Sequence, residues 1–176
     1  MNFKNKLLAL FLLFVCACAQ KPTLVSESYP ILIKTEPQKN QSLQRVLKSE
    51  YSLVDIRKPF DQAGKSQPGS VPLWWEDETF RDERGQRYFD SVTKLAERWS
   101  DKGMHPNKPV ILIHDPADKK SLNIVLCLFR QFEFKEIYPI SINDIRSLNV
   151  SSQYQVEEAP FWNANADLDL NSCLKF

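Results

Sequence analysis

The sequence has few glycines, few histidines and no excess of charge of either sign. Four glycines in 176 residues exclude a phosphate-binding loop built from several glycines. Two histidines provide little material for a metal site, and none is expected. The 23 basic and 22 acidic residues give a formal net charge of +1, so nucleic acid is excluded as a partner. We expect no cofactor.

The rest of the composition is that of an ordinary globular domain. Hydrophobic residues make up 43% of the chain and charged residues 26%. The length fits one domain with appendages better than two domains. We therefore expect a tether over 18–29, a domain over 30–148 and a tail over 149–176 that packs on the domain.

Residues 1–17 are typical of a secretory signal peptide. Lys4 and Lys6 precede an apolar run over 7–15, which is shorter than the roughly 20 residues that a membrane span needs. A buried N-terminal helix is the alternative, but polar sequence follows the run at once.

The end of this segment, Val15-Cys16-Ala17-Cys18, resembles the bacterial lipoprotein box. The resemblance implies cleavage after Ala17 and acylation of Cys18, which would attach the protein to a lipid bilayer. Ala19 then favours the periplasmic face of the outer membrane. Ordinary cleavage that leaves Cys18 as a free thiol is the other interpretation.

Hydrophobic periodicity predicts strands that alternate with helices. The expected elements are an extended run at 30–34, a helix at 40–48, a strand at 51–56, an apolar run at 71–74, a helix at 88–99, a strand at 110–113, a helix at 122–132, a strand at 136–140 and a helix at 142–148. This order predicts an α/β fold with a central parallel sheet flanked by helices on both faces. Segment 81–87 is expected to be a solvated loop, and 167–171 an edge strand or an exposed tail.

The run Val110–Ile113 reads as the central strand, because it is apolar without interruption. Ligands bind outside the carboxyl ends of the strands in such sheets. The loop after Ile113 is therefore the place to look for a site.

Four segments together resemble the rhodanese-like family, over roughly residues 40–148. They are Leu53-Val-Asp-Ile-Arg57-Lys-Pro-Phe60, Pro68-Gly69-Ser70-Val71, Lys108-Pro109-Val-Ile-Leu-Ile113 and Phe132-Glu-Phe134-Lys-Glu-Ile-Tyr138. In the last one, Glu133 replaces a glycine of the family pattern. The resemblance implies a rhodanese-like fold in which a cysteine directly after the central strand carries sulfur as a persulfide.

The loop that should carry this chemistry is degenerate. His114 stands at the position of the cysteine, and an imidazole cannot form a persulfide. Pro116 removes one backbone N–H group, and Asp115 and Asp118 place negative charge where the family holds an anion. Lys119 or Lys120 could still provide the basic side chain that the family commonly has in this loop. The loop extends to Ser121. No catalytic residue is expected, and the domain would be a binding or structural module of the cell envelope.

Several alternatives remain open. Cys127, which lies in an apolar helical stretch, is a buried free thiol or forms a disulfide with Cys173. Either thiol could support sulfur transfer, or His114 could carry chemistry of its own. Trp74 and Trp75 are a possible partner surface, with packing of at least one of them favoured. The partner would be an envelope protein or a small anion.

Overall fold

The computed structural model describes residues 37–148, 150 and 161–176. The expected signal peptide, the lipid attachment at Cys18, the tether at 18–29 and the extended run at 30–34 lie outside these residues. Within them, no helix has both the length and the apolar character needed to cross a membrane.

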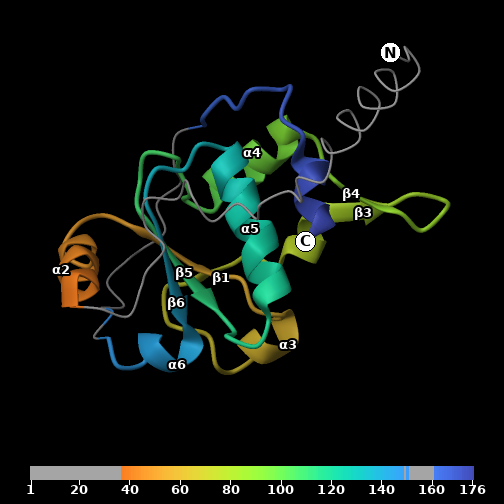
Figure 1. Cartoon of the computed structure of the whole chain (residues 1–176). Coiled ribbons are helices and arrows are strands. Elements are labelled where there is room, and N and C mark those ends of the chain that lie inside the picture. Colours follow the sequence, from red (N-terminus) through yellow and green to blue (C-terminus); the bar gives the residue numbers. More distant parts are fainter. Residues whose placement is uncertain (1–36, 149, 151–160) are drawn as a thin grey trace, which may run out of the picture. The chain divides into compact units, whose positions relative to one another are not determined.

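Four parallel strands form the main sheet, in the order β2-β1-β5-β6. Figure 1 labels β1, β5 and β6 of this sheet. They are β1 (Ser52–Asp55), β2 (Val71–Pro72), β5 (Val110–His114) and β6 (Ile137–Ser141). Strand β5 lies between β1 and β6, and the side chains of Val110 to Ile113 are 0% exposed. The predicted central strand and the predicted parallel sheet are confirmed.

Helices connect the strands. The α-helices are α2 (Pro37–Val46), α3 (Pro59–Gln62), α4 (Val92–Asp101), α5 (Lys119–Gln131) and α6 (Ile142–Ile145), and the 3-10 helices are η1 (Trp75–Glu78) and η2 (Leu170–Lys175). Side chains of α2 and α6 share one buried cluster with alternate residues of the sheet, such as Leu53 and Ile111. Helices α4 and α5 meet through Trp99, whose ring centroid lies 5.1 Å from that of Phe129.

A second, antiparallel pair of strands was not expected. Strands β3 (Thr79–Arg81) and β4 (Arg87–Phe89) form a hairpin beside η1 (Figure 1). The predictions of a helix beginning at 88 and of a loop over 81–87 were therefore wrong in part. Ser91 is the residue that starts α4, because its hydroxyl accepts the N–H of Lys94 at 3.4 Å.

The C-terminal segment Phe161–Phe176, which we call the strap, packs on the domain. Trp162 is 7% exposed, and its indole N–H donates to the carbonyl of Met104 at 3.0 Å. The side-chain oxygen of Asn171 accepts the backbone N–H of Phe89, which ties η2 to the hairpin. The edge strand considered for 167–171 is absent, because η2 begins at Leu170.

A disulfide joins Cys127 of α5 to Cys173 of η2. Cys173 is 0% exposed, so the strap is held at a buried point. The interpretation of Cys127 as a free thiol is therefore wrong. The apolar residues near Cys127 on α5 surround a disulfide to a segment 46 residues later in the sequence.

Candidate functional site

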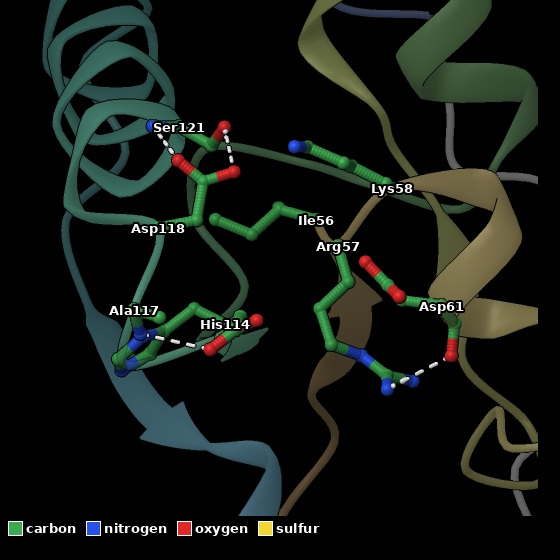
Figure 2. Close-up of a pocket in the computed structure, with 9 residues that line it drawn as sticks. Ile56, Arg57, Lys58, Asp61, His114, Ala117, Asp118 and Ser121 are labelled. Carbon is green, nitrogen blue, oxygen red and sulfur yellow. Dashed lines mark hydrogen bonds between the residues drawn. The ribbon is translucent and has the colours of Figure 1, made fainter.

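A cleft of about 270 Å³ lies at the carboxyl ends of β1 and β5 (Figure 2). The two strands pair in parallel, so the segments that follow them meet at the same edge of the sheet. The residues that line the cleft come from these two segments: Ile56, Arg57, Lys58, Asp61, His114, Asp115, Ala117, Asp118 and Ser121. The loop after Ile113 therefore borders a cleft, as the sequence predicted.

Asp115 shapes the first half of this loop. Its carboxylate accepts the backbone N–H of Ala117 at 2.8 Å, and its carbonyl accepts the N–H of Asp118 at 3.0 Å. Pro116, between them, has no N–H to offer. The loop thus folds back on Asp115 and directs these two N–H groups to its own oxygens.

Asp118 caps helix α5. One carboxylate oxygen accepts the backbone N–H of Ser121 at 3.1 Å, and the other accepts the hydroxyl of Ser121 at 2.7 Å. The positive end of the helix dipole stabilises this carboxylate. A negative group of the protein therefore already occupies the position where a helix N-terminus would hold an external anion.

Trp75 contacts this helix cap through Ser121. It is 6% exposed, and its indole N–H donates to the hydroxyl of Ser121 at 3.0 Å. The guanidinium of Arg87 lies 5.1 Å from the ring centroid, and the ammonium of Lys120 lies 5.9 Å from it. Trp75 is thus buried against the loop and does not belong to an exposed partner surface, whereas Trp74 is partly exposed.

His114 is partly buried at the end of β5. Its Nδ1 is inaccessible to solvent and has no hydrogen-bond partner among the described residues. A histidine that acts as a general base is normally oriented by a hydrogen bond from its second nitrogen to a carboxylate or carbonyl. The carboxylates of the neighbouring loop are instead bonded to backbone N–H groups, so this arrangement does not orient His114 for acid–base catalysis.

Arg57 lines the cleft, but its charge is paired with that of Asp55. Its guanidinium forms a two-pronged ion pair with Asp55, with Nε 2.9 Å from Oδ1 and Nη2 2.6 Å from Oδ2. It also donates to the carbonyls of Asp61 and Lys65, which fixes the segment that contains α3. Hydrogen bonding to Asp55 raises the pKa of Arg57 above its ordinary value, against the effect of burial.

The remaining charges make the cleft acidic. Lys58 lines it together with three aspartates, Asp61, Asp115 and Asp118. The two lysines proposed for the basic position, Lys119 and Lys120, are exposed and do not line the cleft. The lining therefore carries no net positive charge that would lower the pKa of a thiol or attract an anion.

The described residues contain no cluster of three or more histidine, cysteine, aspartate or glutamate side chains that could hold a metal ion. Cys127 and Cys173 are joined to each other, so neither is a thiolate in the oxidised protein. The role of Trp75 in supporting the loop was missed, because no sequence pattern connects it with Ser121.

The chain matches no protein-family model, and a search of curated proteins finds no significant match.

Proposed function

We propose that the chain is a membrane-anchored lipoprotein whose rhodanese-like domain is catalytically silent and serves as a binding or structural module in the cell envelope. One observation supports the proposal that the domain does not transfer sulfur. The loop after β5 has an imidazole at the position of the sulfur acceptor, and its N–H groups at Ala117 and Ser121 bind the protein's own carboxylates.

The arrangement of the four segments supports a rhodanese-like fold. The segments that carry the resemblance contribute β1, β2, β5 and β6, which are neighbours in one parallel sheet. We further propose that helices cover both faces. Leu53 and Ile111 pack with α2 and α6 on one face, and the alternate residues Val54 and Leu112 are equally buried, as expected if α4 and α5 cover the other face.

The disulfide supports export. Disulfides persist in oxidising compartments, such as the bacterial periplasm, and are rare in the cytosol. The Cys127–Cys173 bond therefore agrees with a signal peptide at 1–17, acylation at Cys18 and a place on the periplasmic face of the outer membrane.

Of the two partner classes, the site favours an envelope protein over a small anion. An anion at the α5 N-terminus would have to displace Asp118 and would meet the acidic cleft. Trp74 is partly exposed, and Phe60, two residues after the cleft residue Lys58, is 88% exposed. Aromatic side chains of this kind are enriched in the centres of protein interfaces.

A thiosulfate-dependent sulfur-transfer assay tests the silent state. We expect no turnover above buffer for the mature protein, and none for His114→Cys, because the new thiol would share the cleft with Asp115 and Asp118, which already bind the N–H groups of Ala117 and Ser121. Turnover by the wild type that disappears in Cys127→Ser or Cys173→Ser would instead support sulfur transfer through one of these thiols.

Membrane fractionation tests the anchor. Cys18→Ser should move the protein from the membrane pellet to the soluble fraction, because lipid attachment requires the thiol. Cys16→Ser is the matched control and should leave the protein in the pellet. Retention of Cys18→Ser in membranes would refute lipid attachment at this residue.

A further inference from the structure

A second and larger cleft lies at the opposite end of β5. Its volume is about 480 Å³, within the range of about 300–1,000 Å³ that small-molecule sites occupy, whereas the cleft at His114 is smaller than that range. Residues of three segments line it: 105–107 before β5, 131–135 at the end of α5 and just after it, and 162–168 of the strap. The residues proposed above for the silent site play no part in it.

The walls of this cleft are fixed relative to one another. The indole N–H of Trp162 donates to the carbonyl of Met104, and its ring centroid lies 5.3 Å from that of Phe132. Across the other side, the ammonium of Lys135 donates to the side-chain oxygen of Asn107 at 2.7 Å. The cleft is therefore formed before any ligand binds, which lowers the entropic cost of binding.

Glu133 in this cleft has an unfavourable backbone conformation. It ends α5 with a φ of +58°, and it is the one non-glycine residue with positive φ among those described. The N–H of Phe134 bonds to the carbonyl of Phe129, and that of Glu133 to Arg130, a Schellman motif whose left-handed position normally holds glycine.

Helix α4 provides an internal comparison. It ends in the same motif, with Gly103 at φ +75° in the left-handed position. A glutamate in this conformation is less stable than a glycine, because its Cβ crowds the backbone. Non-glycine residues in such conformations cluster at functional sites. The strain at Glu133 therefore points to a role for its side chain, which lines the cleft.

The polar groups of the cleft suit an uncharged ligand with many hydroxyls. The carboxamides of Gln131 and Asn163 can each donate and accept hydrogen bonds, as sugar hydroxyls do. The charges of Glu133 and Lys135 are opposite, so the cleft does not select for a net ionic charge.

His105 adds a neutral donor. Its Nδ1 accepts the backbone N–H of Asn107 at 3.1 Å, which places the ring proton on Nε2. Burial, and to a smaller extent the charges of Lys108 and Lys135, lowers the pKa of His105 below its ordinary value, which favours the neutral ring.

We propose that this cleft binds a small neutral saccharide, with Glu133 as the residue that accepts hydrogen bonds from its hydroxyls. The proposal goes beyond the silent domain and does not depend on it.

Calorimetric titration of the mature protein, kept in a sugar-free detergent, tests the proposal with glucose, N-acetylglucosamine and maltose as probes. At least one probe should bind with a Kd of about 1 mM or tighter. Glu133→Gly should weaken that binding by about tenfold or more, because a charged hydrogen-bond acceptor is lost. The same variant should raise the Tm by about 2–4 °C through relief of the strain, which shows that it is folded.

Lys58→Ala, in the cleft at His114, is the control and should leave saccharide binding unchanged. The proposal is overturned if none of the three probes binds, or if Glu133→Gly binds the probe as tightly as the wild type does.

Discussion

Replacing Arg57 with leucine is expected to lower the free energy of unfolding by about 3–5 kcal/mol, the usual effect of removing one partner of a buried ion pair. The side chains of Arg57 and Asp55 are 5% and 1% exposed. Leucine would leave the Asp55 carboxylate buried without its counter-charge. The bonds from Arg57 to the carbonyls of Asp61 and Lys65 would also be lost. Urea unfolding followed by tryptophan fluorescence measures the change.

The double variant Asp55→Leu and Arg57→Leu is the matched control. It removes both charges together, so it should be clearly more stable than Arg57→Leu alone. If Arg57→Leu unfolds at the same urea concentration as the wild type, the buried pair does not hold the segment after β1, and our account of the cleft is wrong.

Reduction of the Cys127–Cys173 bond is expected to lower the free energy of unfolding by about 2–4 kcal/mol. The bond closes a loop with a sequence separation of 46, which restricts the unfolded chain. Its loss should also free η2 to leave α5. Thermal unfolding with and without dithiothreitol measures the effect without a substitution in the core.

Cys127→Ser and Cys173→Ser are matched variants for the same bond. Each should destabilise the protein by a similar amount, and neither should respond to dithiothreitol. Their combined effect should be little larger than that of one alone, because the two sulfurs form a single bond. Equal melting temperatures for the oxidised and reduced wild type would show that the bond does not stabilise the protein.

The sheet could be predicted because its strongest signals are local. The run Val110–Ile113 is apolar at every position, as a strand buried on both faces must be. The start of α4 was predicted too early because Tyr88 and Val92 have helical spacing. Asp90 and Ser91 separate them, and the serine cap is the signal that places the helix start correctly.

The structure of the strap could not be predicted from local sequence patterns. Alternating aspartate and leucine at 167–170 suggested a strand, but Asp169 accepts the N–H of Ser172 and starts a 3-10 helix. Leu170 and Cys173 then lie three residues apart on one face, and both are buried. The disulfide depends on where the tail meets α5, which no periodicity along the chain specifies.

The place of the candidate site was predictable, but the contacts that support its loop were not. The sequence pointed to the loop after Ile113, which borders the cleft, and Asp118 followed by Ser121 has the spacing of a helix cap. The hydrogen bond from Trp75 to Ser121 spans 46 residues and arises only from the packing of η1 against α5.

The central claim is that no group of the mature protein can hold transferred sulfur. Intact-mass spectrometry under non-reducing conditions, after incubation with thiosulfate, tests it most directly. We predict a mass unchanged by the donor, with Cys127 and Cys173 still joined. A stable gain of the mass of one sulfur atom, located on a peptide of the domain, would contradict the account.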